Sequence, residues 1–512
     1  MLEDSDGGGN FSGKSHFRCD FSRCIRTLLL LLLLTGSAGA ESVLVHIIQS
    51  SDLHANIDGS REEGAALGEV AWTVKTLRQR HGRENTLYID TGDTVQGSIA
   101  GTLSRGMAPL EFLRKMECEM WVPGNHEFDF GAYRFLELAE SMRPWLVCCN
   151  LRFGIDGIPP YPPYRIFLRG GMRIAVIGAA ASYMDNWFLP SVNRVATATS
   201  ALQAIRRLMP ELRREKPDAV ILAIHQGWMG KNDTRGVNEV AAIAREFPEI
   251  DLILGGHTHR SIPGNRIAGG VWYVQPPPYG AFLTHVTMEF NRESRRLECI
   301  TSRLVRPEKG REAPETMELS RYLKQRTAEY AREKIAEAPK RNLLSKGRPG
   351  QGNPVSELIS AAVAGECGAD AVLHGTLSTA GLPSGRPVLR EDLFQIVPYE
   401  NTIVTCEMSR EELAEVVAEQ WSLRKSYSFN GLYGVRAVVE RGGNVKILTE
   451  KPRLKVALNS HAAAGSGRTP ILKQILAKPE NKCSDTGIST RDALEKYIRI
   501  HGTDIQTQTW IE

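Results

Sequence analysis

The stretch "SVLVHIIQSSDLHANI", Ser42 to Ile57, decides the fold class of this chain. Residues 42–50 are rich in Val, Leu and Ile, and the polar segment "SDLHANI" follows them directly. A short apolar run that ends in turn-forming residues indicates a buried β-strand. In an extended segment, residues i and i+2 point the same way. We therefore expect the side chains of Asp52 and His54 to reach one metal ion.

Similar apolar runs recur over the first 290 residues or so, and helical patterns separate several of them. Segments 69–82 and 201–215 carry apolar residues at helical spacing. This alternation predicts a layered α/β domain with helices outside the sheets, in which ligands bind at the carboxyl ends of strands. The further predicted strands are "TLYIDTGD" (86–93), "WLVCCNL" (145–151), "RIAVIGA" (173–179), "AVILAIH" (219–225), "DLILGGH" (251–257) and "THVTMEF" (284–290).

Other strand ends carry polar groups of the same kind. They are Asp93 in "DTGDTVQGS", Asn125 in "PGNHEFDFG", His225 after "AVILAI", and the pair His257 and His259 in "GGHTHR". All are oxygen or nitrogen donors. This set suits divalent Zn, Mn, Fe, Mg or Ca and does not select one of them.

Seven such groups, with one bridging carboxylate, can form two four-ligand sites. Two ions ~3.5–4 Å apart can hold a hydroxide at neutral pH and clamp the attacking and leaving oxygens of an in-line displacement at phosphorus. A lone histidine after a strand is more often packed or solvated than a ligand, and each segment alone could be a turn or a surface loop. Five such segments in one domain favour a metal centre.

The order D-x-H, G-D, G-N-H-E, H, G-H-x-H resembles that of the calcineurin-like metallophosphoesterases. "GNHEFDFG" and "DTGDTVQGS" resemble the 5′-nucleotidase family of exported bacterial and animal enzymes more specifically. Three later segments resemble the C-terminal domain of that family, and the resemblance spans roughly residues 43 to 500. They are "NPVSELISAAVAGECGADAVL" (353–373), "DLFQIVPYENTIV" (392–404) and "DTGISTRDALEKYI" (485–498).

The resemblance implies an α/β protein and a metal-dependent phosphoric ester hydrolase with two divalent ions. We expect a four-layer α/β/β/α catalytic domain over residues 41–305 and a linker over 306–345, with a helix near 314–336. A smaller mixed α/β domain, for substrate binding, is expected over 346–512. "SKGRPGQGNP" (345–354) is a Gly- and Pro-rich break at that boundary.

The resemblance also assigns roles to single residues. His126 corresponds to the catalytic histidine, which stabilises the charge of the transition state or protonates the leaving oxygen. Asp129 pairs with His126, fixes the ring and raises its pKa, whereas Glu127 has a structural role. One ion is bound by Asp52, His54, Asp93 and His259, and the other by Asp93, Asn125, His225 and His257, so that Asp93 bridges.

The second half departs from the family at the positions that read the nucleoside. In "HGTLSTAGLPSG" (374–385), His374 stands in place of an Asn, and Thr379 in place of a substrate-binding Arg. In "NSHAAAGSGR" (459–468), His461 replaces a stacking Phe. Phe429 lies where the other stacking aromatic is expected. Phe429 and His461 are therefore the candidate substrate-binding residues.

These departures leave several substrates open. The leading hypothesis is hydrolysis of 5′-nucleotides or related nucleotides. The alternatives are 2′,3′-cyclic nucleotides, nucleotide sugars, non-nucleotide esters and, ranked low, sulfur chemistry. A binding module that kept the fold without catalysis, or a metal-stabilised structural protein, is a different class of function. An intact set of metal ligands argues against both, and structural metal sites tend to be Cys-rich.

The N-terminus predicts export. Arg23 and Arg26 precede a run of leucines, and Ala38-Gly39-Ala40 fits a signal-peptidase site, so residues 1–40 are expected to be a signal peptide. The apolar run is too short for a membrane span, and we expect a periplasmic or secreted protein without a stable membrane anchor. The net charge of +4 gives no indication of a nucleic acid polymer as partner. The cysteine spacings suggest no disulfide framework.

Overall fold

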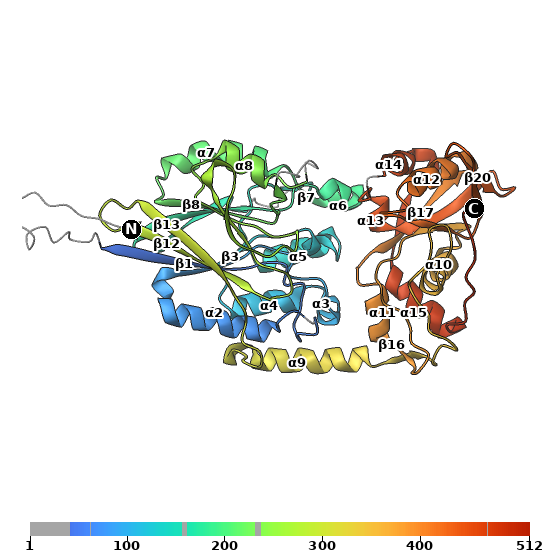
Figure 1. Ribbon diagram of the computed structural model, residues 1–512, viewed down its shortest axis with the longest axis horizontal. Helices are drawn as coiled ribbons and strands as arrows, with labels where there is room; N and C mark the ends of the chain where they lie inside the picture. Colours follow the sequence, from blue (N-terminus) through green and yellow to red (C-terminus); the bar gives the residue numbers. More distant parts are fainter. Residues whose placement is uncertain (1–40, 62, 156–160, 231–236, 427, 468) are drawn as a thin grey trace, which may run out of the picture.

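The computed structural model describes residues 41–61, 63–155, 161–230, 237–426, 428–467 and 469–512. They form two α/β domains, which a long helix connects along one side (Figure 1). The expected signal peptide, residues 1–40, lies outside the described residues.

The first sheet of the N-terminal domain is built around the strand that was predicted over residues 42–50. β1 (Ser42–Ser50) lies parallel to β2 (Thr86–Asp90) and antiparallel to β12 (Leu283–Asn291). β3 (Met120–Trp121) and β13 (Leu297–Val305) form the two edges, in the order β13-β12-β1-β2-β3. The carboxyl ends of β1 and β2 therefore meet at one edge of the sheet.

The second sheet of this domain has the order β10-β11-β9-β8-β6-β5. Its central strands β6, β8 and β9 run parallel to one another, so their carboxyl ends also lie at one edge. The bounds are β5 Tyr164–Arg169, β6 Met172–Ala179, β8 Ala219–Ile224, β9 Leu252–Leu254, β10 Ile262–Arg266 and β11 Trp272–Gln275.

The two sheets pack face to face, and helices cover both outer faces, as expected for four α/β/β/α layers (Figure 1). Val45 and Ile47 of β1 pack against Ile174 of β6 between the sheets. Alternate residues such as Ile48 face the helical layer on the other side. The helices are α2 (Leu67–His81), α4 (Met107–Lys115) and α5 (Ala132–Ser141) on one face, and α7 (Ala201–Arg214) and α8 (Val240–Glu246) on the other.

One predicted strand is wrong. In the segment 145–151, Leu146 makes only an isolated bridge to Trp121, and the short strand β4 (Leu151–Phe153) begins at the end of the segment. The backbone amides of Val147, Cys148 and Cys149 donate to three separate chain segments instead of one ladder. The apolar run is buried, as predicted, but this bonding prevents a continuous strand.

The connecting helix is shorter than predicted. α9 spans Pro314–Ala331, not 314–336, because residues 334–336 form strand β14, which pairs with β16 (Val388–Leu389). The chain thus enters the sheet structure of the second domain soon after the helix ends.

The second domain is a mixed α/β unit around a sheet of order β18-β15-β21-β17-β22. Its two apolar cores lie on the two faces of this sheet. Its main elements are α10 (Pro354–Cys367), β15 (Ala371–His374), α11 (Arg390–Ile396), β17 (Thr402–Ser409), α12 (Arg410–Ser422), β18 (Gly431–Tyr433), β21 (Arg453–Asn459), α13 (Ser460–Ala463), α14 (Pro470–Leu476), β22 (Ser484–Ser489) and α15 (Thr490–His501).

The two domains touch at two places on either side of the ligand-bearing strand ends. Thr102 Oγ1 donates to Glu400 Oε1 at 2.8 Å, near α9. On the opposite side, Lys473 Nζ donates to the carbonyl of Asp185 at 2.9 Å, and Leu189 packs against a core of the second domain.

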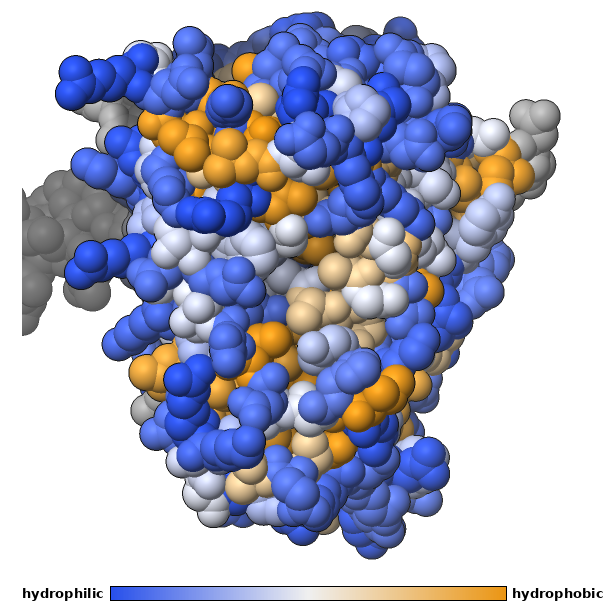
Figure 2. Space-filling view, turned by 90° about the vertical axis from the view of Figure 1, so that its right-hand side faces the viewer, coloured by the Kyte–Doolittle hydropathy of each residue, from blue (hydrophilic) through white to orange (hydrophobic). Residues whose placement is uncertain are grey.

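The outer end of the second domain is largely hydrophilic, with apolar areas among the charged side chains (Figure 2). Within the described ranges, none of the helices has the length and apolar character needed to cross a membrane. The seven cysteines of these ranges are all free thiols.

Candidate functional site

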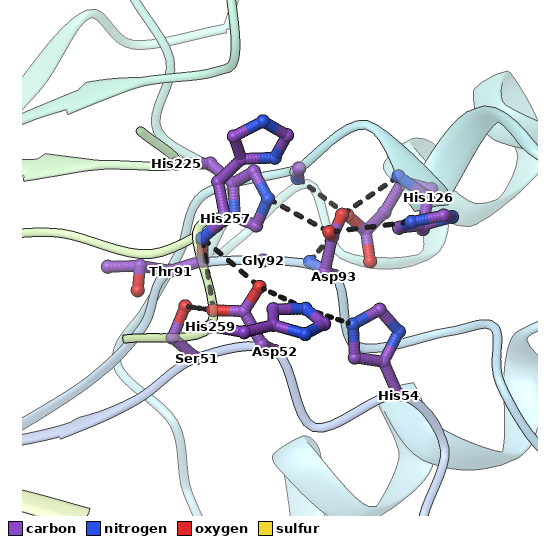
Figure 3. Close-up of polar contacts among 12 residues, drawn as sticks. Ser51, Asp52, His54, Thr91, Gly92, Asp93, His126, His225, His257 and His259 are labelled. Carbon is purple, nitrogen blue, oxygen red and sulfur yellow. Dashed lines mark hydrogen bonds and ion pairs between the residues drawn. The ribbon is translucent and has the colours of Figure 1, made fainter. Parts of the chain in front are cut away.

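The predicted metal ligands lie in loops at the carboxyl ends of five strands, from both sheets. Asp52 and His54 follow β1, Asp93 follows β2, His225 follows β8, and the pair His257 and His259 follows β9 (Figure 3). Asn125 follows β3. Parallel strands whose carboxyl ends share one edge explain why residues so distant in the sequence meet here.

The backbone of these loops differs from the expected extended geometry. Asp52, His54, Asp93, His257 and His259 all have positive φ, between 47° and 70°. Positive φ is uncommon for residues other than glycine, and such strain concentrates at functional sites. Each i, i+2 pair therefore converges through a left-handed turn and not through the alternation of a strand.

Asp52, His54 and His259 form one group of potential ligands, with donor atoms within 4.8 Å of one another. The Nε2 atoms of His54 and His259 are 2.9 Å apart, and Asp52 Oδ1 lies 3.3 Å from His259 Nε2. His54 Nδ1 is 3.0 Å from the carbonyl of Gln96, to which it can donate. This bond leaves the lone pair of Nε2 directed into the group, an arrangement typical of metal-binding histidines.

Asp93, His225 and His257 form a second group of the same size. His225 Nδ1 lies 2.6 Å from the carbonyl of Thr91, and Nε2 of the same ring lies 3.0 Å from Asp93 Oδ2. If Nδ1 carries the ring proton, a neutral His225 and the Asp93 carboxylate face each other as two acceptors. A cation between them satisfies both.

Buried polar atoms show that these residues fit a metal. Asn125 Oδ1 is buried and has no hydrogen-bond partner among the residues that the structure describes, and the buried His225 Nε2 faces the Asp93 carboxylate. A buried acceptor without a partner is costly, and metal coordination removes that cost. Gly124 belongs to the same cradle: a Cβ atom there would lie 2.2 Å from Asp93 Oδ1 and 2.8 Å from His225 Cε1.

The ionisation of the two groups also favours cations. Burial opposes the charge of Asp93, but the neighbouring imidazoles, His225 first, hold its pKa well below the usual value. Burial lowers the pKa of His54 to about 3 and that of His257 to about 4, so both rings are neutral ligands at pH 7. Burial opposes a charge on His225, yet Asp93 raises the pKa of that ring to about 9. The site therefore demands positive charge beside Asp93.

His126 lies beside the second group without belonging to it. Its Nδ1 is 2.7 Å from Asp129 Oδ2, and its Nε2 is 3.9 Å from Asp93 Oδ2. Burial opposes the charge of the ring, but Asp129 and then Asp93 raise the pKa of His126 to about 10. The arrangement gives a cationic donor at the edge of the site, held in orientation by Asp129.

Glu127 holds the loops together, as the structural role predicted for it requires. The carboxylate is fully buried and accepts from the backbone amides of Asp93, Thr94 and Gly124 at 2.5–2.9 Å. Sequence reasoning did not identify Gln96, whose carbonyl orients His54, or Trp187, whose ring centroid lies 4.9 Å from that of His257. Neither residue belongs to a recognisable ligand pattern, and only the fold brings Trp187 to the site.

The two candidate substrate residues differ in position. His461, on α13, is near enough to the dyad for the charges of Asp129 and His126 to act on it, although burial is the main cause of its lowered pKa. Phe429 lies beside Trp421, with ring centroids 6.4 Å apart. The structure thus brings His461 toward the active site and records a packing contact for Phe429.

A cleft of about 670 Å³ lies between the two domains. Its lining residue Gly97 lies against the backbone of His54, because a Cβ atom on Gly97 would lie 2.6 Å from the carbonyl of His54. Thr379, the residue in place of the family's substrate-binding Arg, lines the opposite wall. Other lining residues are Arg61 and Thr102 from the first domain and Phe394, Gln395 and Pro398 from the second.

Comparison with known families matches both halves of the chain. The calcineurin-like phosphoesterase family matches residues 45–261, and the 5′-nucleotidase C-terminal domain matches residues 334–474. The first match contains all the proposed metal ligands, and the second begins at β14.

Curated relatives are similar over part of their length. Endonuclease YhcR of Bacillus subtilis is 23% identical over 77% of this chain and 34% of its own length. The 2′,3′-cyclic-nucleotide 2′-phosphodiesterase/3′-nucleotidase of Salmonella typhimurium is 24% identical over 52% of this chain and 46% of its own. The chain thus spans about a third to a half of the length of these relatives.

A solved structure shows the same two-domain fold. The 5′-nucleotidase precursor of Thermus thermophilus superimposes with a TM-score of 0.67 at 18% identity, over 92% of this chain and 99% of that one. Both domains and their order are therefore those of one known fold. The chain carries a calcineurin-like phosphoesterase domain followed by a 5′-nucleotidase C-terminal domain.

Proposed function

We propose that the protein is a hydrolase of phosphate esters, dependent on two divalent ions, with nucleotides as its substrate class. The position of Asp93 carries this proposal: its carboxylate contacts His225 of one ligand group, its charge acts on His54 of the other, and His126 lies beside it. Asp93 thus connects both ligand groups with the dyad.

The chain's own residues divide the work. Asp52, His54, Asp93 and His259 would hold one ion, and Asp93, Asn125, His225 and His257 the other. Bound there, the ions would supply positive charge for the phosphate oxygens and acidify water at neutral pH. The identity of the ions is left open by these ligands, which suit Zn, Mn, Fe, Mg or Ca.

His126 and Asp129 would act on the ester directly. Asp129 binds Nδ1, so Nε2 of His126 is the atom free to donate toward the phosphate. A cationic imidazole at this point stabilises the negative charge that develops in the transition state, and it can pass its proton to the leaving oxygen.

The nucleotide preference is supported by the second domain and by the names of the relatives. Residues 378–380 and Phe394 line the cleft next to the ligand loops, where the leaving group of an ester would extend. Relatives named as a cyclic-nucleotide phosphodiesterase and an endonuclease make diesters a second candidate class. We keep Phe429 and His461 as proposed substrate-binding residues, and we propose export on the leader-like residues 1–40.

A substrate panel tests the proposal. The metal-stripped protein is reloaded with Mn²⁺ or Zn²⁺ and offered 5′-nucleotides, 2′,3′-cyclic nucleotides, a nucleotide sugar and an aryl phosphodiester. We expect hydrolysis that a chelator abolishes and that the Asp93→Ala variant lacks. Two bound ions without turnover of any ester would reject the enzyme in favour of a binding module, and turnover confined to a non-nucleotide ester would reject the substrate class.

A further inference from the structure

A second cluster of histidines lies on the outer face of the first sheet, away from the active site. His46 is in the middle of β1, His285 is in the adjacent strand β12, and His81 is the last residue of α2. Their neighbours Val45, Ile47 and Val286 point into the core between the sheets. Since side chains alternate along a strand, His46 and His285 point to the opposite face, toward the end of α2.

The three rings are close enough to share one ion. One nitrogen atom from each ring lies within 4.8 Å of the others, and the ring centroids are 4.0–5.2 Å apart. His46 Nδ1 and His285 Nε2 are 3.2 Å apart. Two imidazole nitrogens bound at ~2.0–2.1 Å to a tetrahedral ion lie about 3.3 Å from each other. The spacing of this pair therefore fits a shared metal ion.

Two of the three rings are buried and the third is partly exposed, which gives a metal ion a path to the nitrogen atoms of the cluster. His46 and His285 are buried, with 6% and 4% of their surface exposed, whereas His81 is partly exposed at the helix end. The buried Nε2 of His81 has no hydrogen-bond partner within the described ranges. Burial lowers the pKa of His46 to about 4 and that of His285 to about 3, so protons do not compete for these rings at pH 7.

We propose that His46, His81 and His285 form a separate binding site for a divalent ion that prefers imidazole, such as Zn²⁺, Ni²⁺ or Cu²⁺. The charged groups that act on these rings are Arg80 and Arg303, both cationic. A site of neutral nitrogen donors beside positive charge disfavours Mg²⁺ and Ca²⁺, which require anionic oxygen ligands. The C-terminal end of α2 offsets part of this repulsion, because a helix C-terminus favours cations.

Without a metal ion, hydrogen bonds connect Arg303, His285 and His46 in that order. A bound ion must replace some of these hydrogen bonds. Arg303 Nε donates to His285 Nδ1 at 3.4 Å, which places the proton of a neutral His285 on Nε2, facing His46 Nδ1. Thr287 Oγ1 also lies 3.2 Å from His46 Nδ1. For an ion to take Nε2, the proton moves to Nδ1 and Arg303 turns into solvent, where its exposed side chain already reaches. Arg303 is thus a competitor of the ion.

Metal counting tests the proposal independently of the hydrolase. The full chain is stripped with a chelator, dialysed against Zn²⁺ or Ni²⁺, and its metal content is measured by mass spectrometry. His81→Ala is expected to lower the count by about one ion per chain, with the rate of ester hydrolysis unchanged. The matched control is His501→Ala, which removes an exposed histidine from the end of α15 and should leave the count unchanged.

A second variant tests the competition without removing a ligand. Arg303→Gln should bind the additional ion several-fold more tightly, seen as a lower Zn²⁺ concentration for the same rise in melting temperature. Cu²⁺ bound to the wild type should give an electron paramagnetic resonance signal with nitrogen couplings that His81→Ala loses. An equal metal count in wild type and His81→Ala, or weaker binding in Arg303→Gln, would overturn the proposal and leave a hydrogen-bonded cluster.

Discussion

His126 Nδ1 lies 2.7 Å from Asp129 Oδ2, and this contact points the other ring nitrogen toward the ligand-bearing loops. The two residues are three apart on one short helical turn, so the pair is local in the sequence. Its placement beside Asp93 depends on the amide of His126, which donates to Asp93 Oδ1 at 2.8 Å. The contact between His126 and Asp129 and the backbone contact of His126 with Asp93 together orient the dyad toward the metal ligands.

The dyad predicts a loss of rate without a loss of metal. His126→Ala should keep both ions and lower kcat by ~10²–10⁴-fold, because general acid catalysis contributes about that much. Asp129→Asn should cost less, since the ring stays in place. Steady-state kinetics with metal analysis on the same samples measures both effects. Full rate in His126→Ala would contradict the role assigned to this residue.

Removing ligands one group at a time should separate the two ions. His257→Ala should lower the affinity for one ion, whereas Asp93→Ala should lower the affinity for both, because Asp93 adjoins both groups. Titration calorimetry with Mn²⁺ on stripped protein measures the number of sites. Asp58→Ala, a change in an exposed residue of the loop after β1, is the control. Two intact sites in Asp93→Ala would exclude a shared carboxylate.

Glu127 should matter for stability as well as for activity. Its carboxylate accepts from the amides of Asp93, Thr94 and Gly124, and Glu127→Ala leaves these buried donors without their acceptor. Each unsatisfied donor costs ~1–3 kcal/mol, so we expect the free energy of unfolding to fall by at least ~3 kcal/mol. Urea denaturation measures it, with Glu137→Ala on the exposed face of α5 as the control.

Acid should destabilise the protein partly through His374. Burial lowers the pKa of His374 to about 4, while an unfolded histidine titrates near 6.5. The folded state therefore binds fewer protons in this window, so the contribution to stability is complete above pH 6.5 and is lost as the pH falls toward 4. The loss amounts to at most ~3 kcal/mol. Between pH 7 and pH 4 the urea midpoint of the wild type should fall more than that of His374→Asn, and about as much as that of His501→Asn.

The contact between Thr102 and Glu400 should influence how the domains sit. Two bonds from Arg491 Nη1, at 3.1 Å to each carboxylate oxygen, hold Glu400 in place, and Thr102 donates to it from the first domain. Thr102→Val removes that donor and keeps the shape of the side chain. We expect a wider distribution of interdomain distances by double electron–electron resonance between spin labels on the two domains. An unchanged distribution would show that this contact does not restrain the domains.

Much of the fold could be predicted from local patterns. β1 spans Ser42–Ser50 as predicted, and β6, β8 and β12 differ from their predicted ranges by one or two residues at their ends. β8 and residues 174–179 of β6 are buried, so their apolar runs are unbroken. The strand prediction for the segment 145–151 is wrong because an apolar run indicates burial and not the partners of the backbone amides. Those partners lie in three separate parts of the chain.

The sequence by itself determined which groups are the candidates for the chemistry, because the candidate ligand loops are short and each follows a strand whose pattern is local. The tertiary structure decided how they meet, through the contact of His225 with Asp93 and the left-handed backbone at Asp52, His54, Asp93, His257 and His259. It also decided that His46, His81 and His285 lie together, since strand register and helix packing join residues up to 239 positions apart. A local sequence pattern does not predict contacts between residues so far apart in the sequence, because the register of the strands is set by the burial of whole sheet faces.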